Sequence, residues 1–213
     1  TQWMTAGAGI LHDELPTDEL VRTGGLFHGI QLWVNLPATL KFAPPRYQDI
    51  RPDRLALLTS DDGGTLVRVI AGELAGHRGP GVTYTPISYA HATLTAGARL
   101  SLPWVPEYNA LVYVLAGSGT VGPDDEPIRE GQLAVLGPGD GLTLAADPHG
   151  DSRAPNLDVL LIGGRPIGEP VVSYGPFVMN TREEIMQAIL DYQAGRMGVI
   201  PARHLSPEMG EPR

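Results

Sequence analysis

Residues 1–16 read TQWMTAGAGILHDELP and decide which fold the rest of the chain is expected to adopt. Gly7 and Gly9 favour a tight turn between two strands, because only glycine takes positive φ without a steric penalty. The strand that follows would carry His12 and Glu14, and residues two apart on a strand point to the same face. The sequence therefore predicts strand, turn and strand over residues 1–14, with an imidazole and a carboxylate side by side.

An imidazole and a carboxylate on one face are half of a metal site. The chain contains no cysteine, so thiolate ligands are excluded, and the remaining donors suit Fe(II), Mn, Ni, Cu or Zn. The alternative is a polar pair on the solvent-facing side of an edge strand. His28 either lines the mouth of the same barrel or plays a structural role. The other histidines are expected in loops or on the surface: His77, His91, His149 and His204.

The composition favours many short strands and excludes several kinds of function. The 213 residues include 27 glycines and 20 prolines, with few aromatic residues, as in strands joined by turns. No apolar window is long enough for a membrane span and no signal peptide is visible, so a cytoplasmic protein is expected. The net charge of −9 disfavours direct contact with nucleic acid. No G-x-S-x-G nucleophile elbow, P-loop or complete dinucleotide fingerprint is present.

Alternating apolar residues and turn signals predict the order of the elements. Residues 17–23 are expected to form a loop, 29–36 a strand and 43–52 an extended connector. Asp-Asp-Gly-Gly at 61–64 predicts a hairpin between 55–60 and 65–71, and residues 72–86 are a candidate boundary. Later strands are expected at 90–94, 98–102, 110–115, 132–136 and 156–162. Thr181 and Glu184 form a capping-box pattern that predicts a helix at about 182–194.

The chain also contains a weak internal repeat. A shift of about 130 residues superposes the first stretch on a second one in which the two turn glycines recur. The aligned pairs are Gln2 with Gln132, Gly7 with Gly137, Gly9 with Gly139, His12 with Leu142 and Glu14 with Leu144. We therefore expect two copies of one barrel, of which the second is packed with leucines where the first offers metal ligands.

Several long motifs resemble one family. G-x-G-x-x-H at residues 7–12 resembles the second motif of cupins, and WMTAGAGILHDELP, GLFHGIQLWVNLP, PPRYQDI and EPVVSYGPFVMNTREEI resemble pirin, in this order along the chain. The resemblance implies an all-β bicupin, two cupin barrels of which the first is incomplete, with a short C-terminal helix. The expected domains are the remaining half of an N-terminal metal-binding cupin (1–75), a C-terminal cupin without metal (76–170) and a C-terminal extension (171–213).

The same resemblance implies an activity and a cofactor. His12 and Glu14 would hold iron, and two further histidine ligands would come from a His-x-His pair upstream of Thr1. The implied function is a dioxygenase of the quercetin 2,3-dioxygenase type, acting on a flavonol-like aromatic substrate and O₂, with Glu14 as the base. The alternative is an iron-binding, redox-responsive regulator that acts through a protein partner. The chain alone is expected to bind iron poorly and to be inactive.

Overall fold

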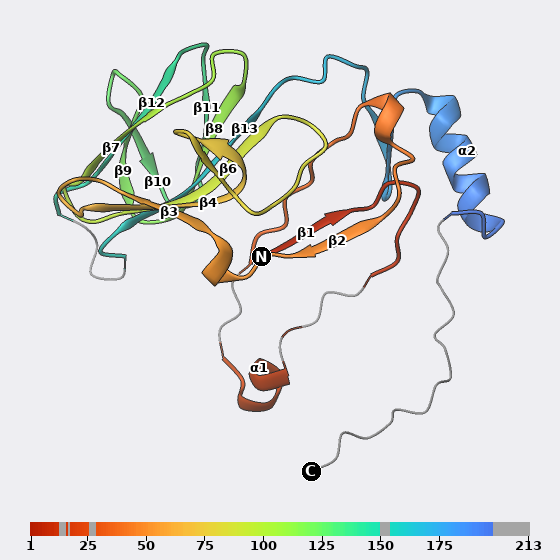
Figure 1. Cartoon of the computed structure of the whole chain (residues 1–213), viewed down its shortest axis with the longest axis horizontal. Coiled ribbons are helices and arrows are strands. Elements are labelled where there is room, and N and C mark those ends of the chain that lie inside the picture. Colours follow the sequence, from red (N-terminus) through yellow and green to blue (C-terminus); the bar gives the residue numbers. More distant parts are fainter. Residues whose placement is uncertain (13–15, 17, 26–28, 150–153, 198–213) are drawn as a thin grey trace. The chain divides into compact units, whose positions relative to one another are not determined.

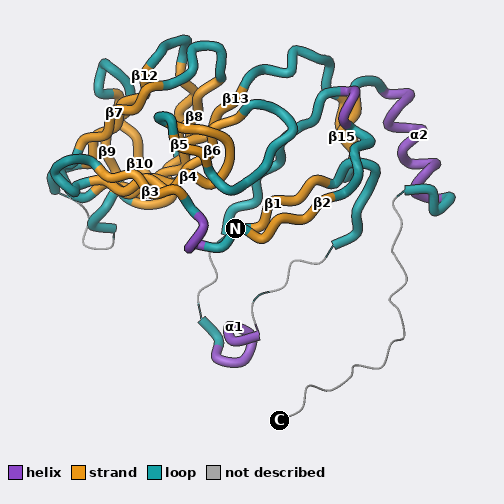
Figure 2. The backbone as a smooth tube through the Cα atoms, viewed as in Figure 1, coloured by secondary structure: helices purple, strands orange, loops and turns teal. Residues whose placement is uncertain are grey.

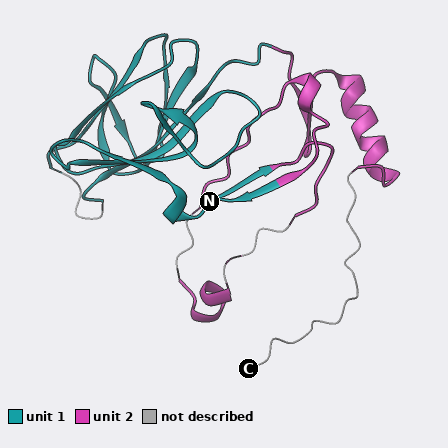
Figure 3. Cartoon of the chain, viewed as in Figure 1, with its two compact units in different colours: residues 1–4, 47–168 teal, residues 5–46, 169–213 magenta. Residues whose placement is uncertain are grey.

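The chain is mostly β-structure, as predicted for an all-β fold (Figure 1). The computed structural model describes residues 1–12, 16, 18–25, 29–149 and 154–197, and Figure 2 shows that strands are far more abundant than helices among them. The described chain divides into two compact units, which are coloured in Figure 3. Unit 1 comprises Thr1–Met4 and Tyr47–Gly168, and unit 2 comprises Thr5–Arg46 and Glu169–Arg213.

Unit 1 contains a barrel made of two antiparallel sheets. The larger sheet has seven strands in the order β11-β8-β13-β6-β4-β3, with β5 paired to β4. The smaller sheet has the order β10-β9-β12-β7. The strands of the larger sheet are β3 (Ala56–Thr59), β4 (Thr65–Leu74), β5 (His77–Arg78), β6 (Ile87–Leu94), β8 (Asn109–Ala116), β11 (Leu133–Leu136) and β13 (Leu157–Gly164). Those of the smaller sheet are β7 (Arg99–Pro103), β9 (Ser118–Val121), β10 (Glu126–Arg129) and β12 (Gly141–Ala146).

The interior of this barrel is apolar and is lined by both sheets. Along β6 every second residue is buried, and the same alternation runs along β12, as expected where one face of a strand meets the core. The fully buried side chains come from β4, β6, β8, β12 and β13. Each such Val or Leu contributes about 1.5–3 kcal/mol by leaving water. One continuous core therefore holds the two sheets together.

Unit 2 has little regular structure. Its elements are the helix α1 (Asp18–Thr23), the 3₁₀ turn η1 (Ala38–Leu40), the hairpin β14 (Val172–Tyr174) with β15 (Phe177–Met179), and the helix α2 (Arg182–Gln193). The two-stranded sheet of β1 (Gln2–Thr5) and β2 (Arg46–Asp49) lies where the chain passes between the units. A second 3₁₀ turn, η2 (Pro52–Arg54), precedes β3. The expected all-β fold with a β-barrel and a short C-terminal helix is confirmed.

Several local predictions are wrong. Residues 18–23 form a helix rather than a loop, and residues 46–49 of the expected connector form a strand. Residues 29–36 form no strand, and neither do residues 10–12 after the glycine turn. Within the described residues these stretches find no neighbouring strand, and a strand is not stable alone in water. Strand β4 continues past residue 71 into the expected boundary. It pairs with β6, which follows residue 75 in the sequence, so the two strands lie on either side of the predicted domain limit.

The division into cupin domains at residues 75 and 170 stays a prediction. The hairpin of β3 and β4, the later strands and the capped helix α2 lie where the sequence places them. Among the helices of the described residues, none has the length and apolar character required to cross a membrane.

Candidate metal centre

The glycine turn that leads to His12 is fixed against a neighbouring segment of unit 2. Gly7 has a φ of +51°, and a Cβ built there would lie 1.9 Å from the carbonyl oxygen of Ala43. The amide of Ala8 donates to the same oxygen at 3.0 Å, and the amide of Gly9 donates to the carbonyl of Ala6 at 2.9 Å. Glycine is required at position 7 for two reasons, its φ and the closeness of Ala43.

The candidate ligands are only in part within the described structure. His12 is exposed and lies in an irregular segment. The alternation of side chains along a strand therefore does not determine on which face His12 lies. Glu14 and His28 lie outside the described residues. His12 offers an imidazole, which suits a divalent transition metal, but the described residues contain no group of three His, Cys, Asp or Glu side chains able to hold one. This part of the chain does not make a complete metal site.

A polar network around one buried lysine in unit 2 joins residues from the motifs that resemble pirin. Lys41, the only lysine of the chain, is 7% exposed. Its ammonium donates to Oδ1 of Asn35 at 2.9 Å and to the carbonyl of Val178 at 3.1 Å. Burial lowers the pKa of Lys41, and the carboxylates of Glu169 and Glu184 oppose that shift. These contacts attach the C-terminal hairpin to the segment that precedes Ala43.

Two carboxylates complete this network. Glu169 accepts hydrogen bonds from the amide of Ala38 at 2.7 Å and from Nδ2 of Asn180 at 2.9 Å. Glu184 accepts from the amides of Asn180 and Thr181, both at 2.9 Å, and its own amide donates to Oγ1 of Thr181 at 3.2 Å. The last pair is the predicted capping box. The motif residues therefore bind one another through a clasp, which we define as the hydrogen-bonded set around Lys41, Glu169 and Glu184.

The barrel of unit 1 contains the second copy of the repeat. Apolar side chains fill it at the positions that align with His12 and Glu14 of the first copy. Leu142 and Leu144 on β12 are 1% and 3% exposed and belong to the apolar core. In the register of the sheet they lie opposite Leu102 and Leu100 of β7. The prediction that leucines fill this position in the second barrel is confirmed.

Sequence reasoning missed a polar cluster on the larger sheet. His91 was expected in a loop or on the surface, but it lies half-buried on β6. Its Nε2 lies 3.2 Å from Oδ1 of Asp158, which also accepts from Oγ1 of Thr93 at 2.7 Å. Arg68 donates to Oγ1 of Thr93 at 3.0 Å and lies 3.4 Å from Nδ1 of His91. Burial lowers the pKa of His91, Asp158 opposes the shift, and Arg68 adds to it.

Comparison with known proteins identifies the family. Residues 89–198 match the model of the pirin C-terminal cupin domain. The chain is 40% identical to Pirin of Mus musculus over 212 residues, covering 98% of this chain and 69% of that protein. The chain belongs to the pirin family. The chain is also 44% identical to a pirin-like protein of Arabidopsis thaliana over 210 residues, covering 95% of this chain and 65% of the relative.

A solved structure supports the same assignment. The crystal structure of a quercetin 2,3-dioxygenase from Acinetobacter baumannii matches with a TM-score of 0.84 and 38% identity, covering 92% of this chain and 66% of that chain. The chain thus spans about two-thirds of the length of these relatives, and 65% of the plant protein.

Proposed function

We propose that this protein is a metal-dependent dioxygenase of the quercetin 2,3-dioxygenase type, which opens a flavonol-like aromatic substrate with O₂. One observation carries the proposal, namely the likeness to the Acinetobacter baumannii quercetin 2,3-dioxygenase over 92% of this chain. Members of the pirin and cupin families usually bind a metal, which agrees with this proposal. The preference for iron rests on the family resemblance, since an imidazole and a carboxylate suit several divalent metals.

In this proposal His12 and Glu14 are two of the metal ligands. The other donors, two histidines by family resemblance, come from sequence upstream of Thr1 or from another chain. The bound metal would act as a Lewis acid toward the substrate hydroxyl and O₂. Glu14 would accept the proton of the flavonol 3-hydroxyl, because a carboxylate within hydrogen-bond reach of that group serves as a general base. An apolar lining would hold the aromatic rings and exclude water.

The test compares the chain with a longer form that carries the upstream donors. Each protein is loaded with Fe(II), mixed with quercetin under O₂, and followed by the loss of flavonol absorbance and by the release of carbon monoxide. We expect turnover by the longer form, loss of turnover in its Glu14→Gln variant, and weak iron uptake by the chain alone. Tight, stoichiometric uptake by the chain alone would contradict the assignment of only two ligands to it.

The alternative is a regulator that binds a protein partner according to the state of its iron. The same assay separates the two functions. If the metal-loaded longer form leaves quercetin unchanged while the His12→Ala variant loses its metal, the site is a metal site without this activity, and the regulator is favoured. If His12→Ala and Glu14→Gln both keep full metal content, the proposed ligand pair is wrong for either function.

A further inference from the structure

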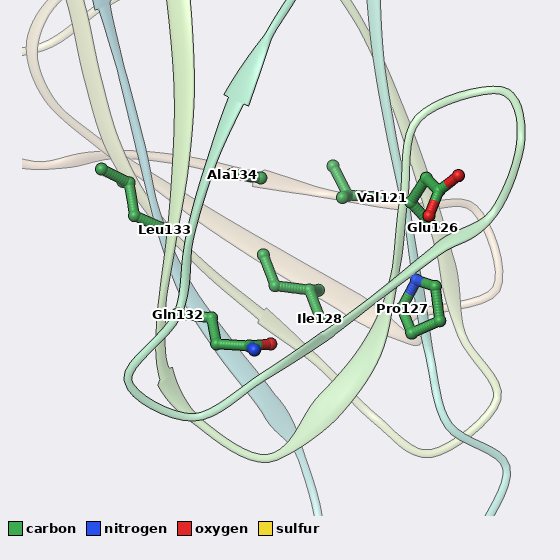
Figure 4. Close-up of a pocket in the computed structure, with 7 residues that line it drawn as sticks. All are labelled: Val121, Glu126, Pro127, Ile128, Gln132, Leu133 and Ala134. Carbon is green, nitrogen blue, oxygen red and sulfur yellow. The ribbon is translucent and has the colours of Figure 1, made fainter.

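The open pocket of about 360 Å³ between β10 and β11 carries little chemistry (Figure 4). The polar side chains of its lining are Glu126 and Gln132, and Oε1 of Gln132 already accepts a hydrogen bond from the amide of Arg129 at 2.9 Å. The segment that follows, between β11 and β12, is chemically different. It reads GPGD over residues 137–140, and its aspartate is followed directly by a glycine, Gly141.

An aspartate that precedes a glycine is prone to turn into isoaspartate without any enzyme. The amide nitrogen of the glycine attacks Cγ of the aspartate, a C–N bond forms, and water leaves with the amide proton and a carboxyl oxygen. Water then opens the resulting succinimide at either carbonyl, which gives aspartate or isoaspartate and needs no oxidant or cofactor. Glycine has no Cβ to hinder the attack. The chain contains two such pairs, Asp62–Gly63 and Asp140–Gly141.

The hairpin between β3 and β4 engages both reacting groups of the first pair. Oδ1 of Asp62 accepts hydrogen bonds from Oγ of Ser60 and from the amide of Gly64. The amide of Gly63, which would be the nucleophile, donates to the carbonyl of Ser60 at 2.9 Å. The hydrogen bonds from Ser60 and Gly64 lower the pKa of Asp62. The protonated carboxyl, from which water leaves, is therefore scarce at this position.

The second pair lacks both restraints. The amide of Trp104 donates to the carbonyl of Asp140 at 2.8 Å, and hydrogen-bonded positions alternate along an antiparallel pair. Gly141 lies opposite Pro103 and therefore points its amide away from β7. On the other side β9 ends at Val121, which pairs with β12 further along the strand. Within the described part of the chain, the amide of Gly141 thus has no acceptor and the carboxylate of Asp140 has no donor. Both residues are exposed.

We propose that the bond between Asp140 and Gly141 is a site of spontaneous conversion to isoaspartate in the folded protein, whereas the hairpin protects the pair at 62–63. Isoaspartate places one additional backbone carbon just before β12, where Leu142 lies opposite Leu102. Conversion therefore loosens the start of β12. It also creates the carboxylate to which an isoaspartyl methyltransferase adds the methyl group of S-adenosylmethionine, so the converted chain becomes a substrate for an enzyme of that class.

Ageing of the folded chain at mildly acidic pH and physiological temperature tests the proposal. Tryptic cleavage after arginine places the two pairs in separate peptides, residues 55–68 and 130–153. Isoaspartate in each peptide is measured by electron-transfer fragmentation and by methyl transfer from S-adenosylmethionine. We expect it to form at least about tenfold faster at Asp140 than at Asp62, because the attack at Asp62 requires several hydrogen bonds to break. In urea the two rates should approach each other.

Two glycine variants keep the test specific. Gly141→Ala should slow conversion at residue 140 several-fold, because its Cβ hinders the attack. The fold tolerates this change, since φ is not positive and the nearest atom to the new Cβ, the carbonyl oxygen of Leu102, is 3.7 Å away. Gly137→Ala is the matched control in the same segment. Its Cβ would meet no atom within 4 Å, and the rate at residue 140 should stay unchanged.

A third variant tests the protection of the first pair. Ser60→Ala removes a donor to Asp62 and should speed conversion there at least about threefold, as the loss of one hydrogen bond allows. The proposal is overturned if both pairs convert equally fast in the folded chain, or if Asp140 reacts only in urea. It is also overturned if Gly137→Ala slows conversion as much as Gly141→Ala does. An unchanged rate at Asp62 in Ser60→Ala would refute the protective role of the hairpin.

Discussion

Replacing Leu142 by alanine tests whether the second barrel is packed as tightly as its leucines indicate. The side chain is 1% exposed and lies opposite Leu102 in a continuous apolar core. Leu→Ala changes at such sites cost about 3–5 kcal/mol, which combines the lost transfer free energy with the cost of the cavity. For a chain of this size, about 2–4 °C of Tm is lost per kcal/mol, so Tm should fall by about 6–20 °C.

The assay is urea unfolding followed by tryptophan fluorescence, because Trp104 is 6% exposed in the same core and reports on the unfolding of unit 1. Leu57→Ala is the matched control, since Leu57 is 58% exposed and its truncation should cost no more than about 1 kcal/mol. If Leu142→Ala costs no more than Leu57→Ala, the second barrel has room at this position, and the interpretation of the leucines as a packed replacement for metal ligands fails.

Three other predictions follow from the polar groups and the glycine turn. Lys41→Met keeps the aliphatic stem but leaves two partly buried acceptors, Oδ1 of Asn35 and the carbonyl of Val178, without their donor, so urea unfolding should show a loss of about 1–3 kcal/mol; a loss within error of zero would show that the clasp contributes nothing. The pKa of His91 is lowered in the folded state, so its neutral form is favoured, and the associated stability is complete above the unfolded pKa of 6.5 and is lost as the pH falls. The free energy of unfolding should therefore decline less steeply in His91→Gln than in the parent chain between about pH 7 and pH 5; parallel declines would contradict this. Gly7→Ala should destabilise the chain by more than about 1 kcal/mol, because φ is positive and the Cβ would collide with the carbonyl of Ala43; Gly24→Ala, where φ is positive but no atom lies within 4 Å of the new Cβ, is the control and should cost less.

The sequence predicted the barrel of unit 1 better than the structure of unit 2. Strands β6 and β8 alternate cleanly and are bounded by turn residues, so their pattern alone locates them. Residues 29–36 show a similar pattern but form no strand, because a strand depends on a neighbour that the local sequence does not report. The short helix α1 has no buried residue and so lacks the apolar periodicity by which helices are found.

The candidate site shows the same limit. The assignment of His12 and Glu14 as metal ligands stays a prediction, whereas other residues of the family motifs form the clasp, which the sequence did not predict. Asn35 and the pair Glu169 and Glu184 come from two motifs far apart in the sequence, and they meet around Lys41, which lies outside the motifs, in the clasp. His91 and Asp158 are separated by 67 positions, so no local sequence spacing could predict their contact. Long-range pairing of β6 with β13 brings His91 and Asp158 together, and hydrogen bonds of side chains between distant segments hold the clasp together.

The burial of the only lysine has a practical consequence. Amine-specific acylating reagents and lysine-specific proteases have a single side-chain target in this chain, Lys41, and the folded protein shields it. The rate of modification or cleavage at this one residue therefore measures how often the C-terminal hairpin detaches. No label has to be introduced to follow that opening. The fourteen arginines, which carry the rest of the positive side-chain charge, react with neither the acylating reagent nor the lysine-specific protease.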